Sequence, residues 1–182
     1  MSDVFTKTKR SEVMSRIRSR GNKDTELALA KLFRRNKITG WRRQLKLRVT
    51  GGKWGVTRKA GVSVSSLVTR HLSLTVRPDF VFRRARLAVF VDGCFWHGCP
   101  RHGTQPAGNR TFWKNKFAGN RARDLLVTRA LRRAGWRVLR IWEHDLHRAT
   151  RRRAAKTPQN EARLIRRIRR AAGFGGQHPK NR

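Results

Sequence analysis

The residues best suited to chemistry gather in one stretch of the chain, residues 77–102. Asp79 stands at the start of a short apolar run, and Asp92 and His97 follow a second apolar run. Both cysteines of the chain fall in the same segment as this histidine. Acid, imidazole and thiol groups crowded at the end of a strand are typical of a metal-dependent site.

Two thiols and two imidazoles have the composition of a zinc site. Cys94 and Cys99 are separated by four residues, and His102 follows after two more. His144 comes just after a predicted final strand, where the sheet would return it to the same edge. Zinc prefers four such ligands in tetrahedral geometry. The alternative is two buried thiols and two surface histidines, but a structural zinc ion would anchor a long loop that has no other support.

Oxygen ligands at the same edge suggest a second, catalytic metal. Asp79 offers a carboxylate to Mg²⁺, and Val91, at the end of the adjacent strand, offers its backbone carbonyl. Such an ion would withdraw charge from a scissile phosphate and activate a water molecule. His97 could carry the proton, and Asp92 could orient His97 or help to hold the metal. Taken singly, each aspartate is also explained by a turn, after Pro78 in one case and before Gly93 in the other.

Three aromatic side chains accompany this chemistry. Phe95 and Trp96 lie between the first cysteine and His97, and Trp113 follows at the start of a predicted helix. On a stiff loop among basic side chains they could stack on DNA bases or wedge between them. The alternative, that they pack under the loop, is equally consistent with the sequence.

Short strands must position these residues. Phe80–Phe82 and Leu87–Val91 are apolar and split by the basic turn Arg83–Arg86, which predicts an antiparallel hairpin. Leu87–Val91 shows no polar alternation, which predicts a central strand buried on both faces. Trp41–Leu47 is expected to be a further strand because its apolar residues alternate.

Helical spacing flanks the strands. Asp24 or Thr25 could cap a helix that ends near Asn36. Residues 111–117 and 120–134 predict one long helix or two stacked helices, ended by Gly135. The predicted buried stripe consists of Leu125, Leu126, Ala130 and Leu131. Trp136–Trp142 predicts the final strand. This order predicts an α/β fold in which a small mixed sheet is flanked by helices.

The chain divides into a central domain, residues 24–147, and two basic extensions. Residues 1–23 predict a basic arm, and residues 148–182 a basic tail containing a solvated or DNA-touching helix. Residues 49–75 are rich in glycine and serine and predict a long surface loop or insertion, although Val62–Val68 could form a strand. A loop of that length is uncommon in a compact domain.

The charge balance points to a polyanionic partner. Lys and Arg number 46 against 10 Asp and Glu, a formal net charge of +36, which favours nucleic acid through release of counterions. No apolar segment of membrane-spanning length and no signal peptide is apparent, so we expect no membrane partner. Few cysteines and no such signals predict a cytoplasmic, nucleoid-associated protein, and we expect a monomer.

Several segments resemble the very short patch repair (Vsr) endonucleases, between about Met14 and His147 and apart from residues 49–75. The segments that carry the resemblance are Arg77-Pro78-Asp79-Phe80-Val81, Val91-Asp92-Gly93-Cys94-Phe95-Trp96-His97, Phe112-Trp113, Gly135-Trp136-Arg137-Val138 and Trp142-Glu143. The resemblance implies a restriction-endonuclease-like (PD-(D/E)xK-type) mixed sheet with a structural zinc site. It also implies Mg²⁺-dependent nicking of one strand of double-stranded DNA at a T·G mismatch. Repair-pathway proteins are candidate partners.

The resemblance also assigns roles by position. It implies that Asp79 and the Val91 carbonyl bind the metal, that His97 is catalytic, that Glu26 supports metal-bound water, and that Asp124 lies near the active site. The zinc ligands would be those already named, and the three aromatic residues would intercalate at the mismatch.

The sequence departs from the family pattern in three respects. Asp92 stands where a second histidine is usual, His144 stands where a cysteine is often found, and the segment before Arg77 is longer than the usual turn. These departures leave open a zinc-stabilised DNA-binding protein of the same fold with lost or altered nuclease activity.

Overall fold

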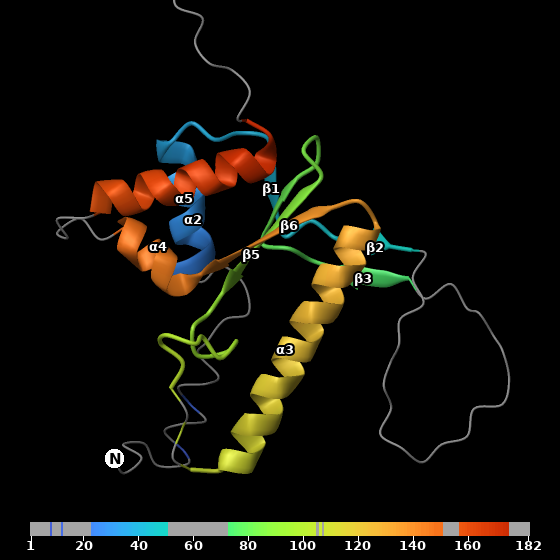
Figure 1. The fold of residues 1–182 in the computed structure, drawn as a ribbon, viewed down its shortest axis with the longest axis vertical. Coiled ribbons are helices and arrows are strands. Elements are labelled where there is room, and N and C mark those ends of the chain that lie inside the picture. The colour runs from blue at the N-terminus through green and yellow to red at the C-terminus, as the bar shows by residue number, and fades with distance from the viewer. Residues whose placement is uncertain are drawn as a thin grey trace, which may run out of the picture.

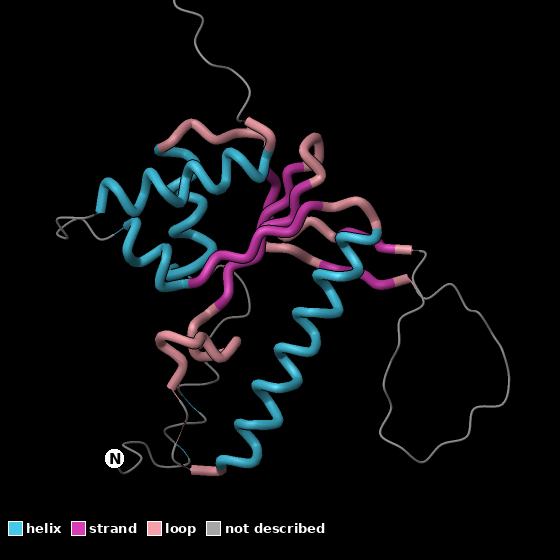
Figure 2. Tube along the Cα trace, in the orientation of Figure 1, coloured by secondary structure: helices cyan, strands magenta, loops and turns pink. Residues whose placement is uncertain are grey.

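The computed structural model describes residues 8, 12, 23–50, 73–104, 106, 108–150 and 157–174. Its elements are η1 (Lys23–Leu27), α2 (Ala28–Arg35), β1 (Trp41–Arg43), β2 (Leu47–Val49), β3 (Leu74–Val76), β4 (Phe80–Phe82), β5 (Leu87–Asp92), α3 (Arg110–Arg133), β6 (Arg137–Trp142), α4 (Glu143–Thr150) and α5 (Thr157–Ala172). Their arrangement is shown in Figures 1 and 2. The predicted arm, residues 1–23, falls almost wholly outside the described residues.

A mixed sheet organises this part of the chain. Its strand order is β1-β4-β5-β6. β4 pairs antiparallel with both β1 and β5, whereas β5 and β6 are parallel, with Asp92 opposite Trp142 in the register. The parallel pair requires a crossover, and α3 provides it. The prediction of a mixed α/β sheet flanked by helices is therefore confirmed.

The hairpin of β4 and β5 also forms as the sequence predicts. Phe80 pairs with Val89 and Phe82 with Leu87 across the two strands. Arg86 closes the turn with a positive φ of 45°. Leu87, Ala88 and Val89 have no exposed surface, which confirms burial on both faces for the first half of this strand. Phe90 and Val91 are half-buried, so the predicted burial does not extend over the whole run.

One face of the sheet is covered by α2, α4 and α5 (Figure 1). Phe80 and Phe82 of β4 pack there around Phe33 of α2, with ring centroids 5.1 and 5.6 Å apart. The buried residues of α5 are Leu164, Ile165, Ile168 and Ala172. The sequence left this helix as either solvated or DNA-touching. The solvated alternative is wrong, because the apolar stripe of the helix is part of the core. Its arginines lie on the exposed face, and contact with DNA stays a prediction.

The other face is covered by α3 and by a small sheet of β2 and β3. Val81 and Ala88 of the hairpin pack there against Ala130 and Leu131. α3 is one continuous helix that ends before Gly135, whose φ is +76°. The predicted buried stripe is half wrong, because its other two members, Leu125 and Leu126, are exposed (57% and 36%). Figure 1 shows that much of α3 extends away from the sheet.

The predicted strand Trp41–Leu47 is instead two strands in different sheets. Gln44, between β1 and β2, has a φ of 53°, which breaks the extended backbone. β2 then pairs antiparallel with β3, so that Leu47 lies opposite Val76 and Val49 opposite Leu74. The ends of the predicted loop, residues 49–75, are thus partly in strands. The possible strand Val62–Val68 lies outside the described residues.

The first helical segment begins earlier than predicted. A single π-helical turn, η1, precedes α2, and the residue before α2, Leu27, makes no side-chain capping hydrogen bond. The proposed caps therefore lie inside the helical segment. The predicted end near Asn36 is confirmed, since Asn36 is the C-cap of α2. Among the described residues, no helix has the length and hydropathy needed to cross a membrane.

Candidate active site and metal centre

The functional side chains meet where β5 and β6 end side by side. Parallel strands bring their carboxyl ends to one edge of a sheet, and the register places Asp92 beside Trp142. The chain then leaves β5 in a loop that runs to α3 (Figure 2). The predicted site residues on this loop therefore face side chains of β6, α3 and α4.

Asp79 lies at the entrance to β4 and is tied to β5. The backbone N–H of Val91 donates to Asp79 Oδ2 (2.7 Å), and the side chain of Gln44 donates to Oδ1 (3.3 Å). Burial raises the pKa of Asp79 to about 6, and the negative charges of Glu26 and Asp92 add to this effect, which the Val91 hydrogen bond partly opposes. A cation bound to this carboxylate would offset the free-energy cost of burying its negative charge.

Glu26 is a second carboxylate near Asp79. It is 5% exposed, and its charge raises the pKa of Asp79. Arg43 of β1 donates to Glu26 Oε2 at 2.9 Å. The ion pair explains how an acid from the first helical segment remains buried at the sheet.

Asp92 is buried, with 4% exposure, and is held by Arg140 of β6. The two residues form a bidentate ion pair, Nε to Oδ2 at 2.7 Å and a terminal guanidinium nitrogen to Oδ1 at 2.5 Å. The same guanidinium lies 2.8 Å from Asp124 of α3. Burial alone lowers the pKa of Arg140, but its bonds to the two aspartates outweigh burial and raise it.

His97 is oriented by Asp124 rather than by Asp92. Its Nδ1 lies 2.6 Å from Asp124 Oδ2 and 3.9 Å from Asp92 Oδ1. Burial alone raises the pKa of Asp124, but the hydrogen bond from His97 and the charge of Arg140 reverse the shift and lower it. With Nδ1 engaged, Nε2 is the nitrogen left for proton exchange.

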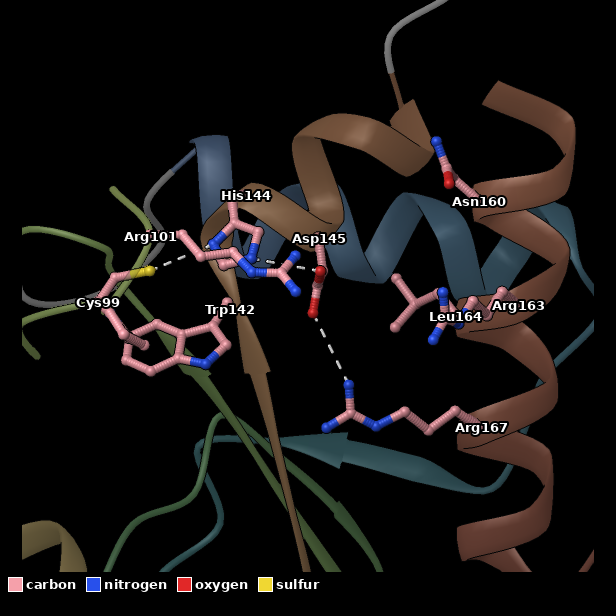
Figure 3. Close-up of a pocket in the computed structure, with 10 residues that line it drawn as sticks. Cys99, Arg101, Trp142, His144, Asp145, Asn160, Arg163, Leu164 and Arg167 are labelled. Carbon is pink, nitrogen blue, oxygen red and sulfur yellow. Dashed lines mark hydrogen bonds and ion pairs between the residues drawn. The ribbon is translucent and has the colours of Figure 1, made fainter. Parts of the chain in front are cut away.

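The two cysteines and two histidines form a compact cluster. The potential ligand atoms of Cys94, Cys99, His102 and His144 all lie within 4.8 Å of one another. His144 Nδ1 is 3.2 Å from the sulfur of Cys94 and 3.5 Å from that of Cys99 (Figure 3 shows Cys99 and His144). A tetrahedral zinc ion would place sulfur and nitrogen ligands about 3.5 Å apart. The cluster therefore fits zinc.

The surroundings of the cluster also suit a cation. The other ring nitrogen of His144 faces Asp145 Oδ1 at 3.4 Å, an arrangement that fixes the orientation of ligating histidines. Glu143 accepts a hydrogen bond from the backbone N–H of Cys94 (2.9 Å). Burial raises the pKa of the Cys94 thiol to about 11, so a metal ion would be needed to hold it as a thiolate near neutral pH.

The predicted DNA-contacting aromatics pack against one another. Phe95 contacts Trp96 and Trp113 with ring centroids 5.1 and 5.2 Å apart. Trp113 is buried, with 8% exposure, whereas the neighbouring Phe112 is 52% exposed. Asn120 donates to the backbone carbonyl of Trp96 (2.7 Å), which ties the loop to α3. These rings therefore fill the space between the loop and α3.

Sequence reasoning missed two site residues. Arg140 binds Asp92 and Asp124, and Glu143 binds the loop at Cys94. An arginine inside an apolar strand is a signal that could have marked Arg140, because it needs an acidic partner when it is buried. Glu143, the first residue after the final strand, belongs to the Trp142-Glu143 segment that carries the family resemblance, but the sequence assigned it no role.

Fold and site together define an α/β protein with an acidic cluster and a cysteine–histidine cluster at one edge of a mixed sheet. Residues 68–102 match the family described as DNA mismatch endonuclease Vsr. Type II nicking enzyme V.NmeDIP of Neisseria meningitidis serogroup C is 35% identical over 150 residues, which are 81% of this chain and 82% of that protein.

Two further relatives are more similar over shorter segments. Type II nicking enzyme V.NaeI of Lentzea aerocolonigenes is 54% identical over 70 residues, 38% of this chain and 42% of that protein. DNA mismatch endonuclease Vsr of Escherichia coli (strain K12) is 42% identical over 72 residues, 39% of this chain and 46% of that protein. These two matches span less than half of the relatives' length. The similarity to V.NmeDIP extends over most of both chains, and this chain belongs to the Vsr family.

Proposed function

We propose that this protein is a DNA endonuclease that nicks one strand of a duplex at a T·G mismatch by Mg²⁺-dependent hydrolysis of a phosphodiester bond. The observation that carries the proposal is the convergence of Asp79, Glu26 and the Asp92–His97–Asp124 cluster at the end of β5. The family relationship supports the reaction class, because its members are named as nicking enzymes and mismatch endonucleases. The proposal includes a restriction-endonuclease-like fold.

Asp79 and the backbone carbonyl of Val91 would hold the catalytic ion, which would polarise the scissile phosphate and acidify its bound water. Asp79 is prepared for this role because its carboxylate is partly buried and near other acids. Glu26 would accept a hydrogen bond from a water molecule in the same site. Its ion pair with Arg43 holds it there.

His97 would transfer the proton in this reaction. Its Nδ1 is held by Asp124, so Nε2 would take a proton from the attacking water or deliver one to the leaving oxygen. Arg140 would act as a positioning residue, because it fixes Asp124 and neutralises Asp92. An Asp92–Arg140 pair thus stands where the family pattern has a second histidine.

The cysteine–histidine cluster would hold a structural zinc ion. Cys94 and Cys99 come from the loop after β5, while His144 comes from α4. A metal bound to both segments would fix the loop that carries His97. Phe95, Trp96 and Trp113 would insert at the mismatch, which requires the rings to exchange their contacts with one another for stacking on bases.

The test is a strand-resolved nicking assay with Mg²⁺ on two duplexes that differ only in one T·G mismatch. Nicking confined to the T strand of the mismatched duplex is expected. Equal cleavage of both duplexes would overturn mismatch specificity and leave a nuclease with another target. Tight binding without cleavage of either duplex would favour the alternative of a DNA-binding protein with lost nuclease activity.

Two further proposals concern the setting. We expect a monomer, because the acidic and zinc clusters are each assembled within one chain. Repair-pathway proteins are expected partners, and a cytoplasmic, nucleoid-associated location follows from the proposed substrate. Sedimentation of the purified protein with and without duplex DNA checks the first of these points.

A further inference from the structure

A basic pocket lies beside the zinc cluster and outside the acidic site. It has a volume of about 490 Å³ and is formed by three segments that are distant in the sequence. Its lining residues are Cys99, Pro100 and Arg101 of the loop, Trp142, His144 and Asp145 at the β6–α4 junction, and Asn160, Arg163, Leu164 and Arg167 of α5. Figure 3 shows these side chains around the opening.

The charge of the pocket suits an anion. Arg101, Arg163 and Arg167 line it, and Asp145 is the one acid among the described lining residues. Asp145 also faces His144 at 3.4 Å, and its distance to Arg167 is 3.7 Å. One shared carboxylate cannot neutralise three guanidinium groups, so the pocket keeps a positive charge.

The guanidinium of Arg167 is held in place by the fold. It donates to the backbone carbonyl of Arg140 at 2.7 Å. Arg140, on β6, also binds Asp92 and Asp124. The bond from Arg167 therefore connects the wall of the pocket to the strand beside the candidate active site. An anchored guanidinium loses less conformational entropy on binding a phosphate than a free one does.

The pocket continues into a strip of arginines along α5. A second hollow on the same helix is lined by Gln159, Arg163, Arg166, Arg167 and Arg170. The spacing of three and four residues places these side chains on one exposed face of the helix, opposite its buried stripe. The buried stripe fixes the helix on the core, so the charge is presented on a rigid surface.

The position of the pocket indicates which anion it takes. Trp142 lines the pocket and stands opposite Asp92 in the sheet register. Arg140 and Trp142 are two residues apart on β6, a separation of about 7 Å in a strand. Duplex DNA carries one phosphate charge per about 1.7 Å of its axis. A duplex placed at the acidic site would therefore bring further phosphates within reach of the pocket.

We infer that this pocket and the arginine strip of α5 bind the DNA backbone at phosphates away from the nicked bond. The inference rests on the proposed function, because it takes the duplex to be the substrate. The contact increases affinity and fixes the position of the protein along the duplex, but it does not recognise bases.

The test compares the Arg163→Gln/Arg167→Gln variant of the full-length, zinc-loaded protein with an Arg83→Gln/Arg84→Gln control. The control removes the same charge from exposed positions in the β4–β5 turn, at the opposite end of β5. Binding is measured on the T·G duplex over a range of salt concentrations. We expect the α5 variant to bind about tenfold more weakly. The slope of the logarithm of its binding constant against the logarithm of the salt concentration should become shallower by about 1 to 2. The control should change by less than twofold.

Single neutral methylphosphonate linkages, placed in turn along each strand, locate the contact. Wild-type protein should lose affinity at one or more positions away from the nick, and the variant should be insensitive there. Equal weakening of variant and control, or no position at which the variant loses sensitivity, would overturn the inference.

Two controls keep the outcomes separate. Zinc content and thermal unfolding verify that the double variant is folded, and Arg163→Gln alone repeats the test without removing the Arg167 anchor. Nicking at saturating DNA is measured in the same samples. Absence of nicking by the wild-type protein defeats the proposed function, whereas normal nicking with unchanged binding by the variant defeats only this inference.

Discussion

Replacing Asp79 with asparagine should abolish nicking and, in the Mg²⁺-free protein, increase stability. Burial raises the pKa of Asp79 from 3.8 to about 6. The folded protein therefore binds this proton more tightly than the unfolded chain does. The stability that comes from the protonated form is complete below pH 3.8 and is lost as the pH rises through about 6.

The size of the effect follows from the two pKa values. The change from 3.8 to about 6 corresponds to roughly 3 kcal/mol of lost stability at pH 8. Because solvent reaches a partly exposed carboxylate, about 1 to 2 kcal/mol is the expected gain for asparagine. The side-chain oxygen of asparagine can still accept from Val91. The gain should be about half as large at pH 5.

Urea unfolding of zinc-loaded wild-type and Asp79→Asn proteins in Mg²⁺-free buffer at pH 5 and pH 8 measures this difference. Glu161→Gln is the matched control, since Glu161 is bound by Arg35 and Asn36 and its loss should reduce stability. Mg²⁺ should raise the melting temperature of the wild type and leave Asp79→Asn unchanged. A variant less stable than wild type at pH 8, or a difference independent of pH, would refute the reasoning.

The remaining predictions concern the partners of His97 and the cysteine–histidine cluster. Arg140→Met should cost about 3 kcal/mol in urea unfolding, because it leaves Asp92 buried without its ion pair; adding Asp92→Asn should recover more than half, and additive losses would contradict the coupling. Asp124→Asn should lower kcat at least tenfold with little change in DNA affinity, and an unchanged kcat would remove Asp124 from the positioning of His97. Because the pKa of Asp124 is lowered in the folded protein, its carboxylate stabilises the fold at pH values above 3.8, its ordinary pKa, and this stabilisation is lost as the pH falls below that value. The difference in unfolding free energy between wild type and Asp124→Asn should therefore shrink in acid. Elemental analysis should find about one zinc per chain, and none in Cys99→Ala; a folded, active protein without zinc would reject the site.

Local pattern was enough to predict several elements of the fold. The apolar runs around the basic turn predicted the β4–β5 hairpin, because strand pairing across a short turn depends on neighbouring residues. The same holds for the end of α3 at Gly135, where the positive φ suits glycine. Clustered chemistry in one loop, from Asp92 to His102, was likewise visible in the sequence.

Tertiary structure decided where helical stripes lie. Leu125 and Leu126 have the same helical spacing as Ala130 and Leu131, yet the sheet extends under only the second pair. On α5 the sequence underestimated burial. An arginine-rich helix with one narrow apolar stripe looks solvent-exposed in the sequence, and only the tertiary structure shows that this stripe packs in the core. Residue type gives the periodicity of a helix but not the extent of the surface that it meets.

The site divides in the same way. The sequence by itself determined which residues could bind metal or carry a proton, since those capacities belong to the side chains. Only the parallel register of β5 and β6 brought Arg140 to Asp92, and only the return of the chain into α4 brought His144 to Cys94. These partners are more than forty residues apart in the sequence. Their contact depends on strand pairing and core packing across the whole sheet, which no local pattern records.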